Sequence, residues 1–288
     1  MKLKTSTLAT PRKQLPLTMA DSEALESESP SPESPSPDSL WETHSQWWQD
    51  GFTDGADVEY EEQILPLAQA LLEGYDRVLD FGAGEGQISR LLSAAGSRVV
   101  GVDPTRSQIA VARARSLDAQ SPDDPVAGIV HPQYAVADGA HLPHGDASFD
   151  AVVGCLVFEH IDPLEPAVAE VARVLQPGGR FALFLNHPLL QTPGSGWIDD
   201  HMVDPPDQYW RIGPYLVESH LVEEVHKDVF IPFVHRPLHR YINTLSAHGL
   251  MVREMHEPSP PQGFLDKSAY YLAAAAIPRL LVLVCERE

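Results

Sequence analysis

Residues 77–103 constrain the fold more than any other stretch of the chain. An apolar strand, Val78–Phe81, runs directly into the glycine loop Gly82–Gly86 (GAGEG), and a helix is expected to follow. A second strand, Arg98–Val102, ends at Asp103. Glycines let the backbone turn tightly and come close to a ligand. A carboxylate about 20 residues beyond such a loop is in position to accept hydrogen bonds from two ribose hydroxyls, so this unit predicts a nucleotide site.

The spacing of the loop glycines indicates which nucleotide is bound. A nicotinamide-dependent oxidoreductase, an alternative enzyme class, would carry G-x-G-x-x-G with a pyrophosphate at the helix N-terminus, whereas this chain has G-x-G-x-G. Asp80 precedes the glycines and Glu85 lies among them; two acids there would repel a pyrophosphate but suit a ligand with a cationic amino-acid end. The pattern resembles motif I of the class I S-adenosylmethionine-dependent methyltransferases. The resemblance implies that S-adenosylmethionine is bound by Asp80, Gly82, Ala83, Gly84, Gly86 and Asp103.

A second segment resembles the third strand of the same family. Residues 134–139 read YAVADG, and Asp138 matches the acid that receives the adenine amino group in that family. The resemblance further implies that a backbone amide, on Gly139 or Ala140, reaches a ring nitrogen of adenine. Asp138 and Gly139 are therefore expected in the cofactor site.

Two more segments follow in the family's order. Residues 148–155 resemble the fourth strand, and the resemblance implies that Cys155 at its end, with residues 156–161, closes under the methionine end of the ligand. Residues 170–180 predict a helix that ends in Pro177-Gly178-Gly179 and leads into a buried strand, with glycine as the left-handed cap.

Strands and helices alternate from Val78 onward, which predicts an α/β fold. We expect a doubly wound, seven-stranded, Rossmann-like methyltransferase sheet over residues 77–288, with an insertion after the fifth strand. Ligands bind such sheets at the carboxyl ends of the strands. Strands are expected near residues 78–81, 98–102, 133–137, 149–154, 180–186, 251–256 and 279–286, and helices near 60–75, 86–95, 105–116, 163–175 and 237–250.

Residues 187–235 interrupt the alternation. They contain a Pro/Gly/Asp-rich segment, 193–208, which predicts a loop, and two alternating segments, 222–226 and 229–233, which predict a hairpin. In the resembled family an insertion at this point commonly builds the acceptor pocket, so residues 187–235 are expected to cover the acceptor site. A surface elaboration or a dimer contact is the alternative.

The N-terminal part divides in two. Residues 1–40 predict a disordered, acidic, Ser/Pro-rich tail, because they hold too little apolar surface to offset the entropy of ordering; Met19 is an alternative start to Met1. Residues 41–76 are expected to form a helical and aromatic cap, whose first helix begins near residue 60. In the resembled family such segments often cover the cofactor, although aromatic residues also serve simply to fasten a segment to the core. The candidates for a lid are Trp47, Trp48, Phe52 and Tyr60.

Charge and composition exclude several classes of protein. The net charge is −21, from 41 acidic and 20 basic residues, and nucleic-acid binding depends on basic surface, so nucleic-acid acceptors are disfavoured. No apolar run reaches membrane-spanning length, and the N-terminus lacks an apolar signal-peptide core. Cys155 and Cys285 lie in apolar runs and are expected to be buried free thiols of a reducing compartment. These features predict a cytoplasmic protein without a membrane partner.

Methyl transfer from a sulfonium requires alignment of donor and acceptor more than a nucleophile or a metal. A hydroxyl acceptor also benefits from a base, for which histidine is the usual choice. His187, which follows the fifth strand, is the first candidate for a catalytic base, ahead of His235 and His160. His235 and His239 have the spacing of metal ligands, but Pro237 lies between them and no third ligand is evident, so no metal site is predicted.

The function predicted from these observations is transfer of a methyl group from S-adenosylmethionine to an unidentified small-molecule acceptor. A catalytically silent protein that binds S-adenosylmethionine or docks partners is the non-enzymatic alternative, and a nicotinamide-dependent oxidoreductase is the third hypothesis. Methylation of oxygen, nitrogen and carbon uses the same cofactor half, so the acceptor stays open at this point.

Overall fold

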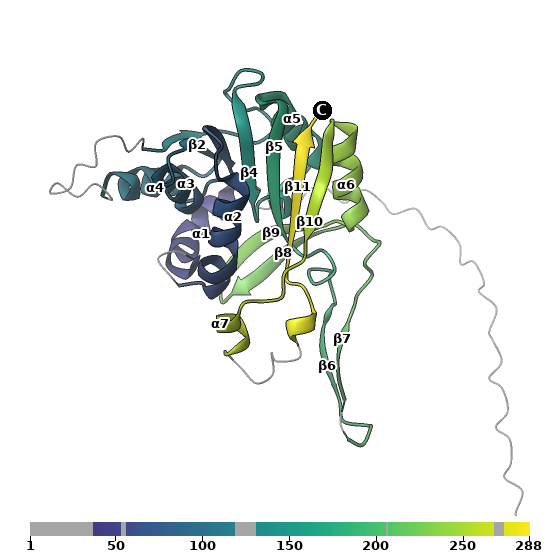
Figure 1. Cartoon of the computed structure of the whole chain (residues 1–288). Helices are drawn as coiled ribbons and strands as arrows, with labels where there is room; N and C mark the ends of the chain where they lie inside the picture. The colour runs from purple at the N-terminus through teal and green to yellow at the C-terminus, as the bar shows by residue number, and fades with distance from the viewer. Residues whose placement is uncertain (1–36, 53–55, 119–130, 206, 268–273) are drawn as a thin grey trace, which may run out of the picture. The chain divides into compact units, whose positions relative to one another are not determined.

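Seven strands of the chain form a single sheet (Figure 1). The computed structural model describes residues 37–52, 56–118, 131–205, 207–267 and 274–288. The strands are β1 (Arg77–Phe81), β2 (Arg98–Asp103), β3 (Gln133–Val136), β4 (Phe149–Cys155), β5 (Leu175–Asn186), β10 (Leu250–His256) and β11 (Leu280–Arg287). Their order across the sheet is β10-β11-β5-β4-β1-β2-β3. The predicted seven-stranded α/β sheet is confirmed, while the predicted tail lies, up to residue 36, outside the described residues.

Parallel pairing brings several strand ends to one edge of the sheet. β1 pairs in parallel with β2 and β4, so that Phe81 stands beside Val102 and Gly154. β11 runs antiparallel between β5 and β10. The strand order reverses at β1, because the chain returns past β1 between β3 and β4. Open α/β sheets bind their ligands at such a reversal.

The strands are apolar because both faces of the sheet are covered. Leu79 and Phe81 pack on one face in a buried cluster that includes residues of α5 (Leu164–Val174) and α6 (Leu238–Ala247). Val78, which points to the other face, packs in a second cluster with residues of α2 (Leu65–Leu72) and α3 (Gln87–Ala94). α4 (Arg106–Asp118) adds a smaller cluster in which Ile109 and Ala112 meet Tyr134. Helices on both faces are the doubly wound arrangement that the alternation predicted.

The predicted helix end at Pro177-Gly178-Gly179 is wrong. α5 ends at Val174, and β5 begins at once at Leu175, which pairs with Phe149. The register of β4 and β5 then shifts, so the proline and glycines form the irregular first part of the strand and not a helix cap. Gly178 nevertheless has a positive φ of 77°, as expected of a glycine cap. It adopts this conformation within β5 and not at the end of a helix.

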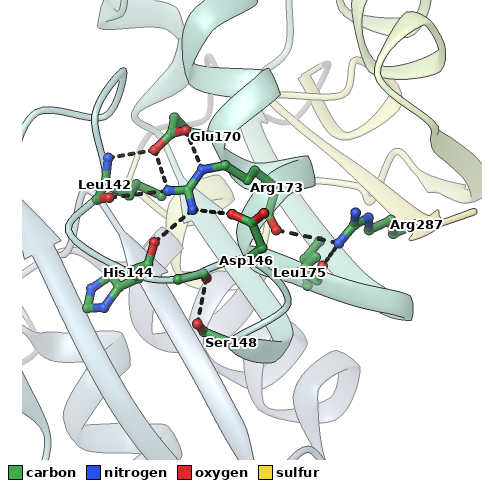
Figure 2. Close-up of polar contacts among 9 residues, drawn as sticks. Leu142, His144, Asp146, Ser148, Glu170, Arg173, Leu175 and Arg287 are labelled. Atoms are coloured by element: carbon green, nitrogen blue, oxygen red, sulfur yellow. Dashed lines mark hydrogen bonds and ion pairs between the residues drawn. The ribbon is translucent and has the colours of Figure 1, made fainter.

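Arg173 on α5 anchors the segment that follows β3 (Figure 2). Its guanidinium donates to both carboxylate oxygens of Glu170 at 2.7 and 2.8 Å and to Asp146 Oδ1 at 2.8 Å. It also donates to the carbonyls of His144 and Leu142 at 2.7 and 3.2 Å. The bond to Glu170 first, and the one to Asp146 second, raise the pKa of Arg173 above its already high value. One side chain thus holds residues 142–146 against α5.

The aromatic segment before residue 60 is a helix, which the sequence analysis missed. α1 (Pro37–Phe52) carries Trp41, Trp48 and Phe52, spaced seven and four residues apart. Residues at these intervals share one face of an α-helix, so the spacing was a signal for a helix.

The predicted helix at residues 60–75 is present but irregular. It opens as a π-helical turn, η1 (Tyr60–Ile64), and continues as α2, which has Pro66 in its first turn. Because proline has no backbone N–H, it is tolerated at the start of a helix. The helix is therefore irregular before Pro66 and α-helical after it.

The insertion after β5 contains two hairpins. The predicted one pairs β8 (Ser219–His226) with β9 (Val229–His235) and is confirmed. The segment predicted as a loop contains β6 (Gly196–Asp200) and β7 (Asp207–Arg211), which are held by a cross-strand contact between Trp197 and Trp210. β9 packs against α1 (Figure 1).

The described part of the chain contains no helix that is long and apolar enough to cross a membrane. Cys155 and Cys285 are both buried and unpaired, as predicted.

Candidate functional site

A cavity of about 650 Å³ lies at the carboxyl edge of the sheet. One part of its wall comes from the ends of β1, β2 and β4 and from the segment after β3, and the other from α1, η1, β8 and β9. A volume of this size is typical of small-molecule sites. Residues that the sequence analysis selected for the cofactor line the first part: Gly82, Ala83, Gly84, Asp103, Asp138, Gly139 and Cys155.

The glycine loop is bent sharply toward this cavity. The N–H groups of Gly82 and Ala83 both donate to the carbonyl of Val102, at 2.8 and 2.9 Å, and so fasten the loop to the end of β2. Gly82 has φ +75°, and a Cβ there would collide with the side chain of Val157. Gly86 has φ +83°, and a Cβ there would meet the Tyr134 hydroxyl. Gly86 does not line the cavity, so its glycine serves the shape of the loop.

Asp103 stands where β2 ends and both of its oxygens are held. Oδ2 accepts the N–H of Gly84 at 3.0 Å, and Oδ1 accepts that of Thr105 at 2.8 Å. Burial raises the pKa of Asp103, and the two N–H donors oppose that rise. A carboxylate offers about four acceptor positions, and the Thr105 side chain is a further partner, so part of the acceptor capacity of Asp103 is left for a hydroxyl in the cavity.

Asp80 does not line the cavity. It is only 1% exposed, beneath the loop, and Oδ2 accepts the Ser89 hydroxyl of α3 at 2.6 Å. Burial raises the pKa of Asp80 to about 6. Asp80 therefore does not reach the cavity in this structure, and it positions α3 relative to β1.

Glu85 is not a free acid beside the loop. Its Oε2 forms ion pairs with Arg90 and Arg115, each at 2.8 Å. Because the two arginines offset the carboxylate charge, Glu85 would repel a pyrophosphate less than the sequence suggested. The glycine spacing remains as the feature that distinguishes the nucleotide, because Asp103 would suit the ribose of a dinucleotide as well.

Asp138 and Gly139 lie on the wall that follows β3. The Asp138 side chain is largely exposed, and Oδ1 accepts the N–H of Ala140 at 2.9 Å. Since that amide is already used, Gly139 is the better of the two proposed donors to an adenine ring. A Cβ on Gly139 would collide with Phe81, so the ring of Phe81 sets the floor beneath this position.

Cys155 ends β4 against the residues of η1. Its thiol lies 4.0 Å from the Tyr60 hydroxyl, and both residues line the cavity. Burial raises the pKa of Cys155 well above its usual range and does the same for Tyr60. Both groups are therefore uncharged at neutral pH, and Cys155 is not a thiolate nucleophile.

α1 forms the wall opposite the glycine loop. Trp48, Phe52 and Tyr60, three of the four lid candidates, line the cavity, and Trp41 joins them. Trp47 does not line it and instead contacts Trp48, Phe52 and His226.

Polar contacts fix α1 to α4. The Glu42 carboxylate accepts the N–H groups of Arg106 and Ser107 at 2.8 and 3.2 Å, at the first turn of α4. The side chains of Gln49 and Gln108 are joined by a buried hydrogen bond of 2.9 Å. Acidic groups at a helix N-terminus are stabilising. These contacts attach α1 to the start of α4, directly after Pro104 and Thr105, which line the cavity.

The structure does not support His187 as the catalytic base. His187 is buried outside the cavity lining; its Nε2 lies 2.8 Å from Glu257 Oε1, and its Nδ1 accepts the N–H of Leu189 at 3.2 Å. The second candidate, His235, also lies outside the lining and contacts the Tyr215 carbonyl at 2.9 Å. Position after a strand end was a poor guide, because the chain turns away from the cavity beyond β5.

Two other histidines line the cavity. His160, in the short helix η2 (Phe158–His160), was the third candidate; its Nδ1 lies 2.7 Å from the Pro232 carbonyl. His220 of β8, which the sequence analysis did not select, lies 3.4 Å from Asp162 Oδ2. The alternation of apolar and polar residues along β8 was the available signal for His220, but it did not show which face of the strand borders the cavity. No group of three potential metal ligands is found among the described residues.

Comparison with known proteins agrees with this site. The family described as "Methyltransferase domain" matches residues 79–183. A demethylmenaquinone methyltransferase of Thermus thermophilus is 33% identical over 131 residues, which are 45% of this chain and 54% of that protein. A 27-O-demethylrifamycin SV methyltransferase of Amycolatopsis mediterranei is 32% identical over 139 residues, 46% of this chain and 48% of that protein. The chain spans about half the length of the curated relatives it matches.

A solved structure extends the similarity over most of the chain. An S-adenosylmethionine dependent methyltransferase from Mesorhizobium loti has a TM-score of 0.63 and 24% identity, and the match covers 77% of this chain and 96% of that one. At this identity the likeness concerns the fold. The methyltransferase domain matched over residues 79–183, the sheet order and the glycine loop with Asp103 confirm the resemblance to the class I S-adenosylmethionine-dependent methyltransferases.

Proposed function

We propose that the protein transfers a methyl group from S-adenosylmethionine to a small-molecule acceptor. The observation that carries the proposal is Asp103, a partly buried carboxylate that lines one cavity together with the glycine loop. That pair suits the ribose of a nucleoside, and Asp138 with Gly139 suits its adenine. Cys155 and Tyr60, both uncharged, border the wall where the methionine end would lie.

A small acceptor is supported by the cavity and by the relatives. Among the described residues that line the cavity, none is lysine or arginine, which disfavours a nucleic-acid acceptor because such binding relies on basic side chains. The names of the two relatives above refer to small organic acceptors, demethylmenaquinone and 27-O-demethylrifamycin SV. A cavity that holds donor and acceptor side by side would meet the main requirement for displacement at a sulfonium carbon, which is alignment of the two reactants.

Calorimetric titration with S-adenosylhomocysteine, with NAD run in parallel, tests the cofactor. Micromolar binding of the former and none of the latter is expected. Transfer of tritium from labelled S-adenosylmethionine into a metabolite extract then tests turnover. Binding without transfer would favour the catalytically silent alternative, and binding of NAD alone would refute the proposal.

A further inference from the structure

The part of the cavity away from the glycine loop has its own chemistry. We call it the acceptor half and define it by Trp41, Trp48, Leu221, Phe233 and His160, which come from α1, β8, β9 and η2. We propose that the acceptor half binds a neutral, largely apolar ring molecule through a hydroxyl, and that His160 accepts the proton of that hydroxyl during methyl transfer. This proposal rests on the proposed function.

The walls favour a flat apolar molecule. Trp41 and Trp48 meet edge to face with ring centroids 5.4 Å apart, and Trp48 stacks on Phe52 at 4.1 Å. Leu221 and Phe233 are cross-strand partners in the β8–β9 hairpin and close the other side. Aromatic and aliphatic walls with a few polar groups are typical of sites for small organic ligands.

The charges of the cavity disfavour an anionic acceptor. Its described lining includes the acids Glu85, Asp103, Asp138 and Asp162 but no lysine or arginine. Asp162 is paired with Arg236 at 2.9 Å, and that arginine is buried outside the lining. A carboxylate or phosphate on the acceptor would lose its hydration without gaining a cationic partner.

His160 is held in one tautomer. Its Nδ1 lies 2.7 Å from the Pro232 carbonyl, which can only accept a hydrogen bond. Nδ1 therefore carries the hydrogen, and in the neutral ring Nε2 is the acceptor. Trp41 at 4.9 Å and Phe233 at 6.0 Å hold the ring edge to face. An acceptor nitrogen fixed by its other ring atom is the arrangement that general bases use.

Other titratable groups surround this histidine. Glu223 on β8 interacts electrostatically with His160. Asp162 and His220 line the same cavity and lie 3.4 Å apart. His220 is mostly exposed, with 63% of its side chain accessible, and no backbone carbonyl fixes its tautomer in the described contacts. His160 is thus the better-ordered base of the two.

The step balances without a further reactant. A lone pair of the acceptor oxygen attacks the methyl carbon, forming the C–O bond. The carbon–sulfur bond breaks and its electron pair stays on sulfur, which becomes the neutral thioether of S-adenosylhomocysteine. The hydroxyl proton passes to Nε2 of His160, and from there to solvent.

The test uses three matched probes with the full chain saturated with S-adenosylhomocysteine: 2-naphthol, 2-naphthoate and 2-naphthylmethylammonium. Quenching of tryptophan fluorescence reports binding, since Trp41 and Trp48 line the site. We expect 2-naphthol to bind at least tenfold more tightly than either charged probe. Preference for the ammonium probe, or no binding of 2-naphthol, would overturn the proposal.

The base is tested with labelled S-adenosylmethionine and 2-naphthol. His160→Asn keeps a donor for the Pro232 carbonyl but supplies no base, and His160→Gln serves as a second variant in case the first folds poorly. Each should bind S-adenosylhomocysteine within twofold of the parent chain yet transfer methyl at least 100-fold more slowly, within the usual range for loss of a general base. His239→Gln, an exposed histidine on α6, is the matched control. If the His160 variants transfer methyl as fast as the parent chain, His160 is not the base. If the parent chain itself does not bind S-adenosylhomocysteine, the proposed function is refuted.

Discussion

Replacing Asp103 by alanine tests the nucleotide site most directly. The variant removes a partly buried carboxylate that is expected to accept two ribose hydroxyls while it holds Gly84 and Thr105. A hydrogen bond to a charged group contributes about 1.5–3 kcal/mol, and each 1.4 kcal/mol corresponds to about tenfold in affinity. Loss of both ribose bonds should weaken S-adenosylhomocysteine binding on the order of 100-fold or more, measured by titration calorimetry.

A control is needed because Asp103→Ala also releases the loop. The 2′-deoxy analogue of S-adenosylhomocysteine separates the two effects. The parent chain should bind the ribose compound more tightly than the analogue, and Asp103→Ala should bind both equally. A variant with a damaged loop alone would bind both weakly and still prefer the ribose compound. Affinity of Asp103→Ala within threefold of the parent chain would show that the ribose does not lie here.

Three further outcomes are expected. Burial raises the folded-state pKa of Asp80 to about 6, whereas the unfolded value is about 3.9. The contribution of Asp80 to stability should therefore fall by roughly 3 kcal/mol as pH rises from about 4 to 6, at 1.4 kcal/mol per pKa unit. The melting temperature of Asp80→Asn minus that of the parent should accordingly be larger at pH 7.5 than at pH 4.5, and an equal difference at the two pH values would contradict the burial argument. Arg173→Lys should lose several degrees in melting temperature and Arg173→Met more, because one ammonium cannot replace a guanidinium that serves five acceptor atoms; equal stability of Arg173→Lys and the parent would show that the network is dispensable. Deleting residues 1–36 should leave S-adenosylhomocysteine affinity unchanged, whereas deleting residues 1–52 removes α1 and should weaken it; equal affinity of the two truncations would remove α1 from the site.

The cofactor side of the fold was predictable because its signals are local. Strands buried on both faces, such as β4 and β11, are continuous apolar runs. The seven strands of the sheet lie within a few residues of their predicted bounds, apart from the early start of β5. The glycine loop could be recognised because Gly82 and Gly86 adopt left-handed φ and would collide with Val157 and Tyr134 if they carried a side chain. A requirement for a left-handed φ or for close packing restricts a single position to glycine, so it can be recognised in the sequence.

The places where the structure differs from expectation have a common physical cause, since each depends on a partner elsewhere in the chain. The start of β5 at Leu175 requires its pairing with Phe149, which overrides the tendency of Pro-Gly-Gly to follow a helix. Asp80 was expected at the ligand, but whether an acid beneath a loop turns outward depends on Ser89 of the next helix. His187 follows a strand end, as expected of a base, but its side chain contacts Glu257 outside the cavity lining.

The acceptor half shows why the substrate could not be predicted from any one motif. Its walls come from α1, η2 and β8–β9, segments separated by about 100 and 60 residues, and each has an ordinary structural reason for its apolar side chains. They converge on one residue: His160 Nδ1 lies 2.7 Å from the carbonyl of Pro232 on β9, and the His160 ring meets Trp41 of α1 edge to face at 4.9 Å. The proposed base therefore depends on three packed elements, so a search of sequences for a catalytic histidine after the fifth strand would select His187 and overlook His160, which lines the cavity.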